Sequence, residues 1–284
     1  MEKLIRFDWA IKKLLRNKVN FDILEGFLTA ILHEDVTILN ILESESNRED
    51  EDDKFTRVDL LVENTTHDLI IIEVQVKSEY DFFHRIAYSA ARLLTEHLEK
   101  GQAYKQIKKV ISISITYFTL GTGTDYLYYG STNFVGVHTQ DVLALAETQA
   151  ELFRYTEVKK IFPEYYLIRV GKFSDEIHEA LDEWIYMLKH NDVKPEFSAK
   201  NIQHASEKLQ VMKLGEEQRK AYEEFIQNVS YQESMLWSAR EEGRFQEKAA
   251  IVKNLLTHGV DLTIIQSSTG LSVQEIQRIQ EGRG

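Results

Sequence analysis

Two acidic side chains and one amide side chain lie on two short apolar segments that the sequence predicts to be strands. Asp59 is in the first segment, and Glu73 and Gln75 are two residues apart in the second. Alternate residues of a strand point to the same face, so Glu73 and Gln75 share a face. Carboxylate oxygens are preferred ligands of hard cations such as magnesium. The three residues therefore form a candidate site for a divalent metal ion.

The pairing of the two segments decides whether the two carboxylates meet. Residues 55–62 and 69–76 flank a short polar stretch, which is the pattern of a β-hairpin. If the turn is centred on Thr66, Asp59 lies directly opposite Glu73, and directly opposed residues have Cβ atoms ~5 Å apart. Two carboxylates that are buried together repel each other unless a cation lies between them. This register would create a metal site.

A simpler interpretation is that Glu73 and Gln75 lie on a solvated face of the sheet, as most polar strand residues do. That interpretation would also expose Leu69 and Ile71, which have the same parity along the strand. The spacing of the residues leaves both interpretations open.

Composition narrows the chemistry of any site. The 284 residues include no cysteine, which excludes disulfides, thiolate nucleophiles and cysteine-ligated metals. The nine histidines form no HxxxH or HxH pair. A net charge of −12 argues against a general nucleic-acid coat protein, because phosphates are neutralised by lysine and arginine. However, residues 34–53 alone carry nine acids against Arg48, so the rest of the chain is close to neutral.

The elements around the candidate site alternate between helices and strands. Residues 7–32 have helical apolar spacing with a break at 17–20, which predicts two short helices, and residues 80–100 predict another. The order helix, three strands, helix, strand predicts an α/β fold in which helices pack on a mixed sheet, and residues from Ser174 onward are helical. Strands are predicted at 36–42, 55–62, 69–76, 109–118 and 165–170, with further strands within 121–138.

Basic and aromatic residues on two predicted helices are candidates for DNA binding. Arg85, Tyr88 and Arg92 recur at i, i+3 and i+7, so they share a helix face that could meet phosphates or bases. Lys12 and Lys13 in the first helix are a second candidate set. The alternative for both sets is ordinary solvated or ion-paired charge.

We expect three parts along the chain: a domain at residues 1–194, a charged helical arm at 195–244, and a small helix-turn-helix-like unit at 245–284. Ser272 and Glu275 have the spacing of a capping box in the last part. The net charge of this part is zero, so DNA reading competes with a role in protein contacts. The arm has sparse apolar residues, which suggests a solvated arm or an oligomer contact.

The segments 57–61 and 72–75, in this order of elements, resemble the PD-(D/E)xK nuclease superfamily. More specifically, the chain resembles the PD-(D/E)xK nuclease family transposases, also described as recombination-promoting nucleases. Further matching positions are distributed over nearly the whole chain: residues 8–15, 27–32, 110–115, 167–173, 184–189 and 269–272, together with Arg92, Gly101 and Tyr104. Each motif is short, and the specificity comes from their order and spacing.

The resemblance implies a restriction-endonuclease-like sheet and assigns roles to residues. Asp59, Glu73 and the carbonyl of Val74 would hold Mg²⁺ or another divalent cation, which activates water and stabilises the phosphate. Gln75 stands where the superfamily usually has lysine; it can orient water but supplies no charge. Glu25 is a candidate auxiliary acid, with a solvated helix residue as the alternative.

The expected function is metal-dependent hydrolysis of phosphodiester bonds by a DNA endonuclease, linked to recombination or a mobile element. The alternative is a weak or inactive nuclease-fold protein that binds DNA or proteins, and a third reading is a DNA-binding regulator that uses residues 259–280. DNA is the expected partner, with homo-oligomers through the C-terminal helices. The longest apolar run is far shorter than the ~20 residues of a membrane span, and the first residues lack a signal-peptide pattern, so we expect no membrane partner and a location in the prokaryotic cytoplasm.

Overall fold

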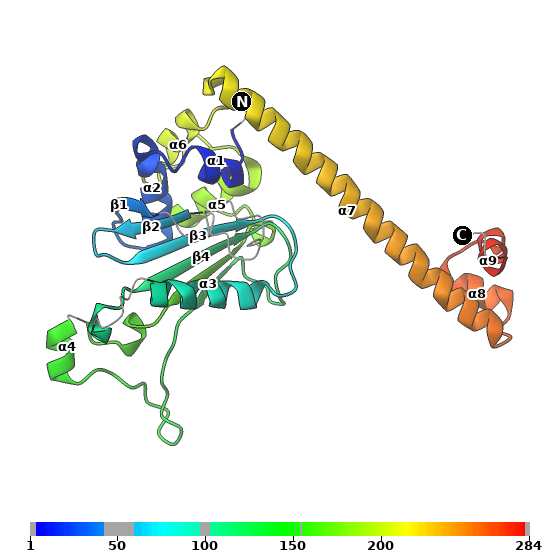
Figure 1. Cartoon of the computed structure of the whole chain (residues 1–284), viewed down its shortest axis with the longest axis horizontal. Helices are drawn as coiled ribbons and strands as arrows, with labels where there is room; N and C mark the ends of the chain where they lie inside the picture. Colours follow the sequence, from blue (N-terminus) through cyan, green and yellow to red (C-terminus); the bar gives the residue numbers. More distant parts are fainter. Residues whose placement is uncertain (1–3, 43–59, 97–102, 154, 282–284) are drawn as a thin grey trace. The chain divides into compact units, whose positions relative to one another are not determined.

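The computed structural model describes residues 4–42, 60–96, 103–153 and 155–281, and it contains two compact units (Figure 1). The division falls between Leu214 and Gly215. Residues 195–214, which the sequence analysis assigns to the arm, are part of the first unit.

A mixed six-stranded sheet forms the centre of the described part of the first unit. The three strands at one edge are antiparallel, the central β3, β4 and β6 are parallel, and β5 is antiparallel at the other edge. The predicted mixed sheet is confirmed. Its strands, in spatial order, are β1 (Ile38–Leu42), β2 (Leu60–Asn64), β3 (Leu69–Gln75), β4 (Val110–Thr116), β6 (Glu164–Arg169) and β5 (Leu127–Gly130).

Helices cover both faces of this sheet, which explains why its central strands are apolar throughout. Every residue of β3 from Leu69 to Val74 is at most 4% exposed. Helix α3 (Phe82–Glu96) lies along one face (Figure 1). Its Ala90 and Leu93 pack in one cluster with the odd-numbered side chains of β2 and β3, among them Leu69.

The opposite face is covered by α1 (Phe7–Lys13), α2 (Phe21–Leu32), α5 (Ala180–His190) and α6 (Ile202–Lys208) (Figure 1). The ring of Phe27 makes edge contacts with Phe7 and Trp184, at centroid distances of 5.8 and 6.0 Å. Gly26 permits this close approach, because a Cβ there would lie 2.8 Å from the Trp184 ring. Large aromatic rings therefore join the first helices to α5.

The predicted break between the first two helices is present. The short 3₁₀ helix η1 (Lys18–Asn20) separates α1 from α2, and the Asn17 side chain accepts a hydrogen bond from the Val19 N–H at its start. Asparagine favours such local caps over a continuing helix.

Residues after α5 complete the first unit. The buried Glu183 carboxylate accepts hydrogen bonds from the N–H groups of Ser198 and Ala199. The Asn201 amide donates to the Asp22 carbonyl of α2, at 2.7 Å. The short helix η6 (Val211–Lys213) follows α6. Buried hydrogen bonds to distant residues attach this segment to the rest of the first unit.

A long excursion between β5 and β6 contains α4 (Glu147–Phe153) and η4 (Val158–Lys160). No α4 residue is buried, so the segment has none of the apolar periodicity that would predict a helix. Two other 3₁₀ turns, η3 (Tyr104–Gln106) and η5 (Val170–Lys172), flank β4 and β6.

The second unit consists of α7 (Glu216–Thr257), α8 (Leu262–Thr269) and α9 (Val273–Gln280). The predicted capping box is present: Ser272 and Glu275 bond each other's backbone N–H groups. Helix α7 continues without a break through residue 244, where the sequence analysis divides arm from terminal unit. Within the described residues, no helix combines the length and apolarity that crossing a bilayer demands. The core of this unit comprises Val252, Ile265, Leu271, Ile276 and Ile279.

Candidate active site

The β2–β3 hairpin has the register that the candidate site requires. Leu60 pairs with Ile72 and Glu63 with Leu69, so the pairs are centred on Thr66 as predicted. The Asn64 side chain fixes the turn by accepting hydrogen bonds from the N–H groups of Thr66 and residue 68. Asp59 itself lies outside the described residues.

Glu73 is a buried carboxylate on the face covered by α3. Its side chain belongs to a residue that is 3% exposed, and the Ser89 hydroxyl of α3 donates to its Oε1 at 3.5 Å. Ser114 of β4 pairs with Glu73 in the parallel register. The Ser114 hydroxyl is fully buried and has no hydrogen-bond partner among the described residues. The interpretation of a solvated sheet face is thus wrong for Glu73.

Gln75 lies at the end of β3 in a polar network with α3. Its Nε2 donates to Glu79 Oε1 at 2.6 Å, and its Oε1 accepts from Arg85 Nη2 at 3.3 Å. Arg85 and Glu79 form an ion pair at 2.9 Å. The three side chains hold one another in place at the carboxyl end of the strand.

The network brings a cation to the position beside the glutamine. The Arg85 guanidinium stacks over the Phe82 ring, 4.9 Å from its centroid, and its side chain is 23% exposed. Its Nε is buried without a hydrogen-bond partner among the described residues. Arginine remains charged at all ordinary pH values, so the network pairs a fixed guanidinium charge with the carboxylate of Glu79.

The other candidate DNA-binding residues do not form one surface. Tyr88 is 58% exposed on α3, and Arg92 forms an ion pair with Glu96 on the same helix. Lys12 and Lys13 are exposed on α1, which covers the opposite face of the sheet (Figure 1). Arg85 of this group contacts the candidate catalytic residue Gln75.

Glu25 is not brought to Glu73. Its Oε1 accepts a hydrogen bond from the Ile38 N–H at 2.9 Å, at the start of β1. Ile38 pairs with Asn64, at the turn end of the hairpin. Glu73 lies four residues along β3 from Leu69, which corresponds to ~13 Å. In the described structure Glu25 anchors β1 to α2.

Sequence reasoning missed Arg169, a buried cation at the end of β6. Its Nη1 donates to the carbonyls of Gly123 and Asp125, and its guanidinium lies 5.8 Å from the Tyr128 ring centroid. Gly123 has a φ of 128°, and a Cβ there would lie 2.1 Å from the Tyr128 hydroxyl. The position of Arg169 at the carboxyl end of a parallel strand is the sequence signal that could have identified it, because functional residues gather at such ends in α/β sheets.

The described residues supply part of a site for a divalent cation. Glu73 provides the hard oxygen that magnesium prefers, and the unpartnered Ser114 hydroxyl is a polar atom that a metal-bound water could satisfy. No group of three histidine, aspartate or glutamate side chains converges within the described ranges. The donor set fits a cation only if residues outside these ranges contribute, and Asp59 is the predicted contributor.

Comparison with known proteins gives one match. A family model described as PD-(D/E)XK nuclease family transposase matches residues 5–239, which include β1 to β6 and much of α7. No curated protein and no solved structure matches the chain.

Proposed function

The chain belongs to the PD-(D/E)XK nuclease family transposases, and on that premise we propose that it is a metal-dependent endonuclease that hydrolyses phosphodiester bonds in DNA. The observation that carries this proposal is the buried Glu73 carboxylate, in a hairpin whose register is centred on Thr66. The family description links the hydrolysis to DNA rearrangement, and we propose recombination or a mobile element as its setting.

Three groups would hold the divalent cation: the carboxylates of Asp59 and Glu73 and the carbonyl of Val74. Such an ion, Mg²⁺ for example, supplies Lewis-acid stabilisation of phosphate charge and lowers the pKa of water. The protein's own part is to fix the ligands. Ser89 does this for Glu73 through its hydroxyl, and the Asn64 turn sets the strand register.

Glutamine lacks the positive charge of the lysine that usually occupies this position, and the neighbouring Arg85 carries such a charge. The Gln75 amide can orient water through its oxygen or its NH₂ group, and it cannot carry charge. We propose that Arg85, which contacts Gln75 at 3.3 Å, provides the positive charge that stabilises the reacting phosphate. Glu79 would position both groups.

One observation favours a second candidate function. Both ends of the Gln75 amide are bonded, to Arg85 and to Glu79, so the residue is committed to the protein rather than to water. A nuclease-fold protein that binds DNA or proteins without cleaving would have this arrangement too.

Cleavage of supercoiled plasmid by the purified full chain separates the two functions. We expect nicked and linear products with Mg²⁺, none with chelator, and none from Asp59→Asn or Glu73→Gln proteins that keep the wild-type circular dichroism spectrum. Lys213→Gln, a change at an exposed lysine of η6, serves as the control and should cleave normally. Metal-independent cleavage would refute the metal dependence, full activity of either carboxylate variant would refute the ligand assignment, and absence of cleavage under all conditions would refute the nuclease function.

A further inference from the structure

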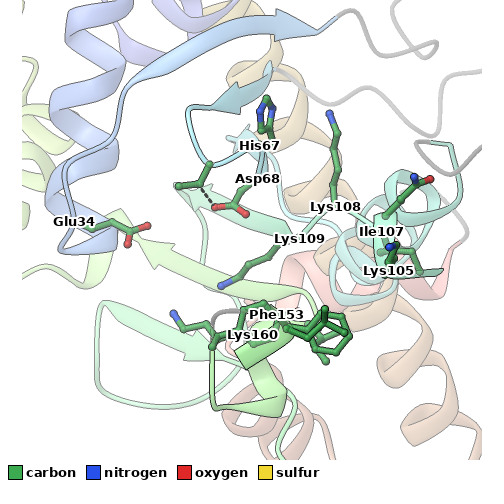
Figure 2. A pocket seen from close by; sticks show the side chains of 14 residues that line it. Glu34, His67, Asp68, Lys105, Ile107, Lys108, Lys109, Phe153 and Lys160 are labelled. Atoms are coloured by element: carbon green, nitrogen blue, oxygen red, sulfur yellow. Dashed lines mark hydrogen bonds between the residues drawn. The ribbon is translucent and has the colours of Figure 1, made fainter. Parts of the chain in front are cut away.

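A cavity of about 850 Å³ lies at the end of the sheet opposite Glu73 (Figure 2). The β2–β3 turn, the residues before β4 and the segment around α4 and η4 line it. Lys109 precedes β4, whose Ser114 pairs with Glu73, so the cavity and the candidate active site are separated by five strand residues, or ~16 Å. The volume is in the range of ligand-binding pockets.

Four lysines line the cavity: Lys105, Lys108 and Lys109 before β4, and Lys160 of η4. Lys108 forms an ion pair with Glu63, and Lys109 forms one with Glu164, each at 2.7 Å. Both carboxylates belong to buried residues. An ammonium has three N–H donors and each of these pairs uses one, so an anion can bind the others.

Lys105 and Lys160, the other two lysines of the cavity, can bind a ligand with their full charge. In the described part of the chain no carboxylate forms an ion pair with Lys105 or Lys160. Of the two acids that line the cavity, Asp68 accepts a hydrogen bond from the Thr66 hydroxyl at 2.7 Å and so belongs to the hairpin turn. The other is the exposed Glu34.

An aromatic pair lines the same cavity. The rings of Phe153 and Tyr155 stack at an interplanar angle of 17°, with centroids 6.0 Å apart, and both side chains are partly exposed. Phe153, Tyr155 and Lys160 all line the cavity, and Figure 2 labels Phe153 and Lys160. Lysines beside an exposed aromatic surface are the arrangement that binds single-stranded nucleic acids, because the bases stack while the phosphates meet the ammonium groups.

We propose that this cavity binds a single-stranded segment of nucleic acid, with phosphates on Lys105 and Lys160 and a base against Phe153 and Tyr155. The inference deepens the proposed nuclease function by assigning it substrates that carry a single-stranded portion. The binding itself requires no metal and no cleavage. It can therefore be tested when the chemistry is absent.

Fluorescence anisotropy of a labelled oligothymidylate with the full chain in chelator measures the charge contribution. Each phosphate contact of a single strand contributes ~0.7 to the slope of log affinity against log salt, so Lys105→Gln combined with Lys160→Gln should lower that slope by about 1.4. The matched control removes two exposed lysines elsewhere in the first unit, Lys172→Gln with Lys213→Gln. Equal slopes for the two double variants would overturn the proposal.

A second variant tests the contribution of the aromatic pair to binding. Phe153→Leu with Tyr155→Leu should weaken binding of the oligothymidylate about tenfold and leave binding of an abasic strand of equal length unchanged. Unchanged oligothymidylate binding in a folded variant, or equal competition by a blunt duplex, would overturn the single-strand assignment. A wild-type chain that binds the strand but never cuts plasmid would refute the nuclease function and leave this inference standing.

Discussion

At the scale of single residues, Glu73 is a strand carboxylate that is buried instead of solvated. It is buried between β3 and α3, and like charge from Asp59 would add to the cost of that burial in metal-free protein. A bound cation would offset this cost. Under the proposed ligand assignment, the carboxylate would therefore link metal binding to the stability of the first unit.

Glu73→Gln should accordingly change how the protein melts. We expect the metal-free variant to melt at the wild-type temperature or a few degrees above it, since ~1 kcal/mol shifts the melting temperature by roughly 2–4 °C at this size. Millimolar Mg²⁺ should raise the wild-type melting temperature and leave the variant's unchanged. Calorimetry with and without metal measures both, and an equal rise in the two proteins would contradict the ligand assignment.

Arg85 provides a second residue-scale test, because its charge is proposed to replace the missing lysine. Arg85→Gln should slow cleavage by roughly 10²-fold, the usual cost of one transition-state donor. Gln75→Lys placed in the Arg85→Gln background should recover at least part of that loss. Arg240→Gln, an exposed arginine of α7, is the control. Single-turnover rates decide the matter: a double variant no faster than Arg85→Gln would show that position 75 does not need a cation.

At the scale of elements, the hairpin and the mixed sheet could be predicted because their information is local. Period-two apolar segments and a polar turn centred on Thr66 sufficed for the register that the structure has. The same parity identified Glu73 and Gln75. Their neighbours could not be predicted: Arg85 was expected on a DNA-facing surface, and its contact with Gln75 depends on how α3 crosses the sheet.

Elements with little buried surface were also beyond prediction. Helix α4 has no buried residue, and hence no apolar period. The cavity lysines come from two segments about fifty residues apart, so only tertiary structure brings Lys105 and Lys160 to one cavity. Local sequence signals such as the Ser272 capping box, in contrast, were predicted residue by residue.

The Lys108–Glu63 ion pair joins β2 to the residues just before β4, and we expect it to make the free energy of unfolding depend on pH. Lys108, and after it His67, hold the pKa of Glu63 below its ordinary value of 4.5. A lowered carboxylate pKa gives stability that is present above pH ~4.5 and is lost as the pH falls through the folded-state pKa. Lys108→Met should therefore destabilise the protein by about 1–2 kcal/mol at pH 7, and the deficit should shrink below pH 4.5.

Urea unfolding of the wild-type and Lys108→Met proteins at pH 7 and pH 4 measures this difference. The control is Lys159→Met, which breaks the ion pair with the exposed Glu157 and should have little effect at either pH. A Lys108→Met deficit that is the same at both pH values would mean that Glu63 is not the group involved.

At the scale of the whole chain, the end of the first unit is a structural boundary that truncation can locate. A chain ending after Leu214 should fold, because it keeps the backbone donors of Ser198 and Ala199 for the buried Glu183. A chain ending after Lys194 leaves that carboxylate buried without them, a loss of several kcal/mol. Circular dichroism melts compare the two, and a cooperative melt of the shorter chain would place the boundary earlier.

We expect the full chain to self-associate through its second unit. Its apolar core lies near its C-terminus, while Tyr231, Met235, Leu236 and Trp237 along α7 are each more than half exposed. A long helix draws most of its stability from packing, and at 3.6 residues per turn these four side chains point in different directions around α7, so we expect more than one partner helix to cover them. Light scattering should give the full chain a multiple of 33.1 kDa and the chain ending at Leu214 its monomer mass.

Leu236→Glu together with Trp237→Glu should return the full chain to a monomer, because charge would be placed at two exposed apolar positions that partner helices would bury. Glu241→Gln and Glu242→Gln on the same helix serve as the control for surface changes and should keep the oligomer. A full chain that already has the mass of one copy at tens of micromolar would contradict the prediction. In that case these side chains would be ordinary exposed apolar residues of the helix.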